Sequence, residues 1–339
     1  MYKKIMLLVS TVVLWFGSAI AQENLWSSAR PDGHAPIRVM GDHYHQKGEV
    51  MFSYRFMPMW MDGNLQGSKY IDNENIYQNY MAAPQKMVMN MHMLGAMYAP
   101  TDRLTLMVMG NFISNAMNLR TKMGADFTTE SSGFGDITLG GLIKLHNTNQ
   151  QSWHAKVGVS IPTGNINQRD DTPMATNTPL AYPMQLGSGT WDPSLGLTYL
   201  AQSDGFSWGA QVNYLFRLGE NEEDYSLGDK TSVNAWAALK VSETWSVSTG
   251  LYYTHLQSID GVDADLNPMM MPLFNAANSG RSQMDLGVGA NFYVPRGSWK
   301  NLRLAAELSF PLVQDATGIQ MKHSFIATVG LQYALGHHD

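Results

Sequence analysis

Large apolar and mixed side chains alternate strictly along residues 49–61, EVMFSYRFMPMWM. The even positions are aromatic or aliphatic apart from one proline: Val50, Phe52, Tyr54, Phe56, Pro58 and Trp60. The odd positions mix thioether, hydroxyl and guanidinium groups: Met51, Ser53, Arg55, Met57, Met59 and Met61. A period of two over this length predicts a β-strand with two different faces. A soluble sandwich and a membrane barrel would both cover the apolar face, so this strand alone leaves both architectures open.

The same pattern predicts eleven further strands, and the links between them alternate in length. The strands are expected at 86–98, 103–112, 135–145, 153–161, 192–201, 206–218, 231–241, 245–256, 283–293, 301–310 and 324–335. Short links lie at 99–102, 146–152, 202–205, 242–244 and around 295–297, and long links at 62–85, 113–134, 162–191, 219–230, 257–282 and 311–323. Transmembrane barrels have short periplasmic turns and long extracellular loops, whereas the two ends of a sandwich obey the same constraints.

The alternation therefore predicts an all-β fold over residues 49–339, a transmembrane antiparallel up-and-down β-barrel of about twelve strands. A soluble periplasmic all-β protein is the alternative. The start of the chain agrees with export, because Lys3 and Lys4 precede an apolar run that ends in Ala19-Ile20-Ala21, the pattern of a cleaved signal peptide at residues 1–21. Residues 22–48 are polar and aperiodic, and we expect them to form a periplasmic arm or a small plug. The predicted location is the bacterial outer membrane.

Composition narrows the range of partners. Charged residues make up 15% of the chain, the formal net charge is −6 and cysteine is absent. The absence of cysteine excludes thiolate metal sites and disulfides, and the absence of a basic stripe argues against a nucleic-acid partner. The partners expected of such a barrel are outer-membrane lipid and lipopolysaccharide, the barrel-assembly machinery, and a small-molecule or metal-ion solute.

Polar and charged residues on the inward parity are the candidate pore lining. A barrel of about twelve strands has a narrow or partly plugged lumen, and its field would be set by the side chains that enter it. The predicted lining residues are Arg55, Arg103, Lys144, Lys156, Gln211, Asn213 and Arg217.

Methionine is unusually frequent: 14 of the 24 methionines lie between Met51 and Met123. In two predicted strands they share the polar parity, which gives a candidate soft-metal set: Met51, Met57, Met59, Met107 and Met109, with His92. Thioethers suit soft cations such as Cu(I) or Ag(I), but methionine is also a flexible apolar filler. No resident cofactor is predicted, and copper enters only as a transported ion. We expect the methionines of the 86–98 strand to face lipid, because Lys86, Asn90 and His92 lie on the opposite parity.

Other histidines and one serine give weaker candidates. His34, His43 and His45 of the arm could add ligands to a metal site, but we expect them to be solvated polar side chains. The loop 267–272, NPMMMP, is either a soft-metal site or an apolar loop folded into the barrel mouth. Ser152 and His154 share a parity, as in an outer-membrane hydrolase, but no third catalytic partner is visible. An enzyme is therefore not predicted.

Four blocks of sequence resemble a known family: 92–114, 131–145, 160–166 and 182–200. The motif SGxGD at 132–136, followed by PTG at 162–164, resembles outer-membrane transporters related to the phenol-degradation meta-pathway family, and more distantly the long-chain fatty-acid transporter barrels. The resemblance implies a channel for small hydrophobic or aromatic compounds. Members rich in Met and His are similar to neighbours of copper-handling systems, which keeps soft-metal transport or tolerance as the alternative. The family implies no catalytic residues.

Overall fold

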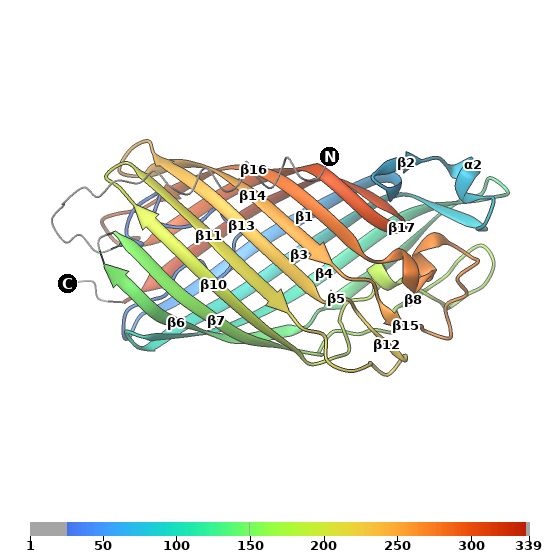
Figure 1. The fold of residues 1–339 in the computed structure, drawn as a ribbon, viewed down its shortest axis with the longest axis horizontal. Helices are drawn as coiled ribbons and strands as arrows, with labels where there is room; N and C mark the ends of the chain where they lie inside the picture. Colours follow the sequence, from blue (N-terminus) through green and yellow to red (C-terminus); the bar gives the residue numbers. More distant parts are fainter. Residues whose placement is uncertain (1–25, 149, 337–339) are drawn as a thin grey trace, which may run out of the picture.

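The computed structural model describes residues 26–148 and 150–336, which form a closed antiparallel barrel (Figure 1). Eleven strand elements follow one another around it, and β17 pairs with β1 to close the ring. They are β1 (Val50–Gly67), β3 (Ala82–Thr101), β4 (Leu104–Thr121), β6 (Ile137–Thr148), β7 (Gln151–Ile161), β10 (Asp192–Gln202), β11 (Phe206–Leu215), β13 (Lys230–Lys240), β14 (Trp245–Leu256), β16 (Arg281–Tyr293) and β17 (Leu302–Leu335). The predicted all-β transmembrane barrel is confirmed. The proposed signal peptide, residues 1–21, lies outside the described residues.

The single element β17 contains both of the last two predicted strands. Residues 303–316 pair with β16 and residues 316–335 pair with β1. The Gln314 side chain bonds both the backbone N–H and the carbonyl of His323 at 2.9 Å, although a straight strand would separate these residues by about 30 Å. The chain therefore reverses between them, at Gly318 with φ +70°. Two lengths of β17 thus line the wall, which gives the barrel its twelfth strand.

Two predicted long loops are instead largely strand. Pairing continues through 311–323, because Pro311 sits at a β-bulge opposite Asp285 and does not end the strand. Likewise β4 continues to Thr121 and pairs with β5 (Asp126–Phe134), forming a ribbon where 113–134 was expected to be loop. Pro311 and the polar residues after 112 were expected to end their strands. Instead, a β-bulge accommodates Pro311, and the polar residues form the two-stranded ribbon of β4 and β5.

The remaining elements are short and gather at the long-loop end of the barrel (Figure 1). They are β2 (Lys69–Ile71), α2 (Asn73–Ile76), β8 (Arg169–Asp170), β9 (Thr178–Pro179), η2 (Tyr182–Met184), β12 (Tyr225–Ser226), β15 (Asp260–Gly261), η3 (Pro272–Phe274) and η4 (Ala276–Asn278). Within the described residues, no helix is long and apolar enough to span a bilayer.

The two faces of the wall have the polarity of a membrane barrel. On β14, Trp245, Val247 and Leu251 are exposed, whereas Ser246 and Ser248 between them are buried. Apolar residues outside and polar residues inside reverse the order of a soluble core. The outer surface is therefore suited to acyl chains.

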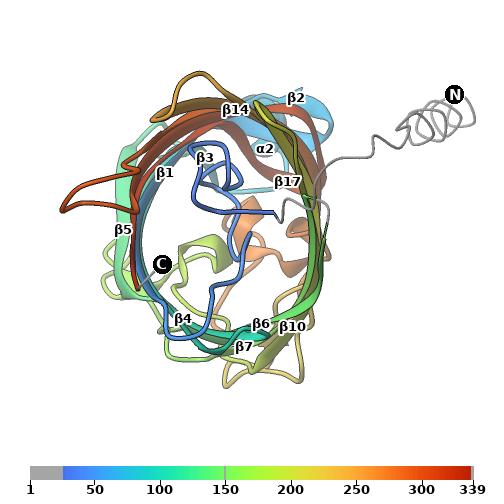
Figure 2. The same ribbon diagram turned by 90° about the vertical axis from the view of Figure 1, so that its left-hand side faces the viewer.

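The polar N-terminal segment lies inside the barrel. Looking along the barrel from the short-turn end, the blue chain before β1 crosses the interior of the ring (Figure 2). Its first described residue, Trp26, donates its backbone N–H to Asn147 at the end of β6, and residue 48 leads into β1. We call residues 26–48 the plug.

A charge placed on the outer face should destabilise the barrel in lipid. Val288 lies in β16 and is 57% exposed. Val288→Arg should lower the free energy of unfolding from lipid vesicles by about 2–4 kcal/mol near the bilayer midplane. Denaturant titration monitored by tryptophan fluorescence measures the change, with Val288→Leu as control. Equal stability of both variants would contradict a lipid-facing β16.

Candidate functional site

The lumen is the candidate site, and wall side chains bind the plug through its backbone carbonyls. Arg303 on β17 donates to Pro31, Arg30 and Ser28 at 2.8, 2.7 and 3.3 Å. Arg55 on β1 donates to the carbonyl of Ile37 at 3.0 Å. An irregular segment has no strand partner for its carbonyls, so these donors satisfy groups that would otherwise be buried without partners.

Neutral wall residues complete the attachment. Ser246 donates to Pro31 at 2.8 Å, and Ser207 donates to Asp32. Gln211 donates to the carbonyls of Met40 and Gly41 at 3.1 and 3.4 Å. The donors come from several strands around the ring, so the plug is held from more than one side.

The predicted pore-lining residues divide between the plug, the lumen and one turn. Arg55 and Gln211 bind the plug directly, and Lys156 approaches the plug at Gly41. The Lys144 ammonium lies 5.3 Å from the centre of the Tyr44 ring in the plug.

The other three predicted lining residues differ in position and in hydrogen-bond or ion-pair partner. Asn213 donates to Gln211 at 2.8 Å, and Arg217 forms an ion pair with Asp192. Arg103 is exposed in the short turn between β3 and β4, so it sits at the rim. Arg103 has the inward parity of Thr105 and Met107, but the turn places it beyond the wall.

A cavity of about 490 Å³ lies between the plug and the long loops. Its apolar wall is formed by Met59, Met61, Met87, Met89, Met321 and Ile326. Arg38 of the plug and Tyr182 and Leu273 of the loops also line it. The cavity thus has a thioether-rich side and is bounded by non-barrel segments at two ends.

The cavity lining carries four basic side chains and a single carboxylate: Arg38, Arg217, Lys230 and Arg281, with Asp285. Arg38 pairs with Asp285 at 2.6 Å, and Arg281 donates to Gln320 at 3.3 Å and to the carbonyl of Met321 at 2.5 Å. Asp285 balances Arg38 and Asp192 balances Arg217. Lys230 and Arg281 remain, so the lining favours a neutral or anionic group next to its apolar side.

The long loops fold inward over the barrel mouth. Met184 ends η2, Phe274 ends η3 and Met271 precedes η3. All three are buried in one cluster with Met87 and Met117 of the wall. Of the two interpretations of loop 267–272, the packing of Met271 favours the apolar loop, although Met269 stays exposed.

Cross-strand pairing turns the methionines into rows on the inner face. Met51, Met97 and Met107 lie opposite one another on β1, β3 and β4, and so do Met61, Met87 and Met117. Directly opposed residues of an antiparallel pair point to the same face. All six of these side chains are buried.

The expectation that the β3 methionines face lipid is therefore wrong. It relied on Lys86 and His92 marking the lumen side, but both are exposed on the outer parity. Lys86 lies 3.6 Å from Asp62, and His92 stacks on Phe56 at 4.7 Å and bonds the Tyr54 hydroxyl at 2.8 Å. Neighbouring side chains thus satisfy these polar groups outside the barrel.

The predicted soft-metal residues do not form one constellation. Met51 and Met107 pack around Tyr44 of the plug, Met59 lines the cavity, and Met57 and Met109 are half-buried. His92 is exposed on the outer face, so the prediction that it is a ligand in the lumen is wrong.

Ser152 and His154 also contact the plug. Ser152 donates to the Tyr44 hydroxyl at 3.3 Å, and His154 Nε2 donates to the Gly41 carbonyl at 2.9 Å. Both side chains are buried. The geometry thus gives each a binding role toward the plug, and neither bonds the other.

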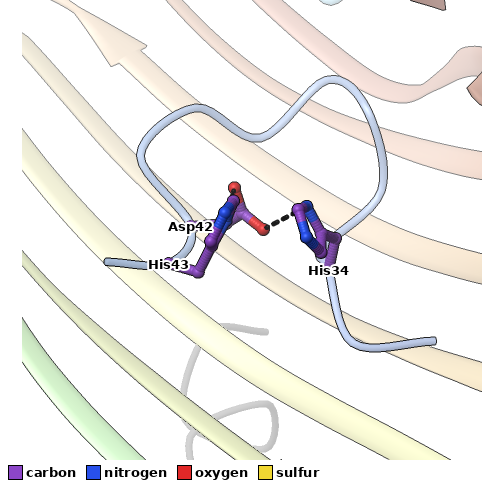
Figure 3. A group of neighbouring side chains, drawn as sticks. All are labelled: His34, Asp42 and His43. Carbon is purple, nitrogen blue, oxygen red and sulfur yellow. Dashed lines mark ion pairs between the residues drawn. The ribbon is translucent and has the colours of Figure 1, made fainter. Parts of the chain in front are cut away.

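The plug contains a titratable cluster of His34, Asp42 and His43 (Figure 3). The histidines were named from the sequence, but Asp42 and the proximity of the three side chains were missed. Burial, and then the nearby Arg303, lower the pKa of His34 well below its ordinary value. Burial by itself would raise the pKa of Asp42, but His43 and His34 outweigh it and leave that pKa below its usual range. Burial also lowers the pKa of His45, against the effect of Glu49. The expectation of solvated histidines is wrong for His43 and His45, which are buried.

Removing the Arg303 guanidinium should loosen the plug. Hydrogen bonds to charged groups contribute about 1.5–3 kcal/mol, so Arg303→Gln should speed exchange of the Gly33 amide, which bonds Arg30, by about tenfold or more. Hydrogen exchange in detergent micelles measures this, with Arg296→Gln in the exposed turn before β17 as control. Unchanged protection at Gly33 would show that Arg303 does not hold the plug.

Three solved structures illustrate what this chain is similar to. An outer membrane channel from Pseudomonas putida F1 has 16% sequence identity and a TM-score of 0.59, over 88% of this chain and 99% of that one. The toluene transporter TodX of P. putida has 13% identity and a TM-score of 0.44, over 87% of this chain and 92% of that one. A Pseudomonas aeruginosa FadL homologue has 10% identity and a TM-score of 0.39, over 84% and 89%. The first similarity supports the barrel fold.

Sequence comparison gives the family. No curated protein is similar enough in sequence to count as a match. The family model described as "Putative MetA-pathway of phenol degradation" matches residues 93–268, just over half of the chain. The match includes β4 to β14 and the SGxGD and PTG motifs, which agrees with the resemblance seen in the sequence. The chain therefore belongs to the family with this description.

Proposed function

We propose that this protein is an outer-membrane channel that passes small hydrophobic or aromatic compounds. The observation that carries the proposal is the cavity of about 490 Å³ with a methionine wall. Small-molecule sites are concave and mostly apolar, with volumes of about 300–1,000 Å³. The family description, phenol degradation, agrees with an aromatic solute.

The methionine wall suits solutes of varied shape. Met59, Met61, Met87 and Met89 come from the paired strands β1 and β3 and reach the cavity side by side. Unbranched thioether side chains repack at low cost and make favourable contacts with aromatic rings. A wall of this kind binds solutes according to their apolar surface and discriminates little between their shapes.

The basic groups narrow the solute class further. Arg217, Lys230 and Arg281 border the same cavity as the methionines. An aromatic ring on the thioethers would leave a hydroxyl or carboxylate substituent facing these side chains. We therefore propose small aromatics with a hydroxyl or acidic substituent as the preferred solutes. Export by a cleaved signal peptide, residues 1–21, is part of this proposal.

Two matched double variants test the cavity. Met59→Gln/Met89→Gln replaces cavity-lining thioethers, whereas Met57→Gln/Met91→Gln replaces the neighbouring opposed pair, which does not line the cavity. Losing apolar contact on two side chains should weaken binding of a fluorescent naphthol probe about 5- to 30-fold in the first variant.

Transport should follow the same order. Proteoliposome swelling in phenol or benzoate should be slower with Met59→Gln/Met89→Gln than with the control pair. Equal binding and equal swelling rates for the two double variants would overturn the cavity as the solute site.

Passage of a soft metal ion is a second candidate, favoured by one observation. Met51, Met97 and Met107 form a buried row of three thioethers, and thioethers are ligands for Cu(I). Met51→Leu/Met107→Leu should then weaken Cu(I) binding about tenfold or more relative to Met269→Leu, whose side chain is exposed. Titration against a Cu(I) chelator measures this. The same affinity in both variants would remove soft-metal passage from consideration.

A further inference from the structure

Three side chains of the plug point their ligand atoms at one another. The candidate atoms of His34, Asp42 and His43 all lie within 4.8 Å of one another (Figure 3). His34 Nδ1 is 3.8 Å from one carboxylate oxygen of Asp42, and His43 Nδ1 is 3.1 Å from the other. The two imidazole rings are 3.9 Å apart between centroids.

Several nitrogens in this group are buried and lack a hydrogen-bond partner. They are Nδ1 of His34, both Nδ1 and Nε2 of His43, and Nε2 of His45. Nδ1 of His34 and Nδ1 of His43 face only the Asp42 carboxylate, at 3.8 and 3.1 Å, whereas Nε2 of His43 and Nε2 of His45 face no partner. Native proteins rarely leave buried polar atoms unpaired, and an absent ion is one explanation for such a group. Two imidazole nitrogens without any partner, beside two that face one carboxylate, point to a ligand that accepts lone pairs.

His45 has the arrangement of a further ligand. Its Nδ1 lies 3.3 Å from a Glu49 carboxylate oxygen, and its ring centroid lies 4.8 Å from that of His43. A carboxylate on one ring nitrogen orients a metal-binding histidine and leaves the other nitrogen for the metal. A cavity of about 30 Å³ borders His34, His43 and His45, and Glu49 and Met51 also line it.

We infer that His34, Asp42 and His43 bind a divalent transition-metal ion, with His45 as the fourth ligand. Imidazole and carboxylate ligands without a thiolate suit Zn²⁺ or Cu²⁺. Metal–ligand bonds of about 2.0–2.2 Å require the ligand atoms to lie closer to one another than 4.8 Å, the distance within which they now lie. The side chains would therefore rotate inward when the metal binds.

Charge around the cavity is compatible with a cation. Asp42 and Glu49 are acidic, and Arg303 is the guanidinium beside them. Arg303 directs its Nη atoms to the carbonyls of Ser28, Arg30 and Pro31. The two carboxylates therefore offset the cation, and the guanidinium keeps its own partners when the metal is present.

The ion would fix the loop that the wall holds. His34 and His43 bracket residues 35–42, which include the Ile37 and Gly41 carbonyls bound by Arg55 and Gln211. A metal joining both ends of this loop restricts its freedom. The site thus couples metal occupancy to the position of the plug, and it is independent of the solute proposed for the cavity.

Zinc titration of the purified protein tests the site. After chelator treatment, Zn²⁺ competition with a chromophoric chelator should show one tight site in the wild type. His34→Gln and His43→Gln should each weaken it by about tenfold or more, whereas His92→Gln on the outer face should not. Heat-modifiable gel migration verifies that each variant is a folded barrel.

Two readouts remain informative even if a variant fails to fold. X-ray absorption of the wild type with Zn²⁺ should show nitrogen and oxygen neighbours at about 2.0–2.2 Å and no thiolate-type shell. Zn²⁺ should also slow amide exchange within residues 34–43 of the wild type. Absence of a tight site in the wild type, or equal Zn²⁺ affinity in the His43→Gln and His92→Gln variants, would overturn the inference.

Discussion

Satisfying the backbone of the plug is the constraint on which the lumen depends. Residues 26–48 have no regular hydrogen-bonded structure, yet they are enclosed by a wall whose outer face meets lipid. Their carbonyls therefore need donors from the barrel, and Arg303, Arg55 and Gln211 supply them. This requirement explains why charged and amide side chains occur on the inner parity of the strands. These three side chains are partners of a folded segment, whereas Arg217, Lys230 and Arg281 line the cavity.

The wall itself was predictable because its signal is local. Strict alternation and the order of short and long links depend on neighbouring residues, and β14 has the predicted bounds. Errors came where the signal is not local. Pro311 looks like a strand end in the sequence, but the opposing strand accommodates it in a bulge. Lys86 and His92 look like lumen residues until their partners Asp62 and Tyr54 are known.

The site was harder to predict than the wall. The alternation of apolar and polar residues correctly predicted that Arg55 and Gln211 face the lumen. It held no information on the plug carbonyls that they bind. The cluster of His34, Asp42 and His43 has no periodic pattern, and only the folding of residues 35–41 brings its ends together. Its one sequence signal was three histidines and an aspartate within twelve residues of an exported chain. The methionine cavity likewise needs the register of β1, β3 and the end of β17, far apart in sequence.

The plug and the inward-folded loops lie at opposite ends of the same cavity, which has a kinetic consequence. On the proposed channel function, a continuous open path through the barrel would require both obstructions to open at once. If each opens independently for about 1% of the time, they coincide for about one part in ten thousand. A solute that binds between them can wait for the second opening after using the first. On the proposed function, two obstructions in series would thus let a bound solute pass while a continuous open path stays rare.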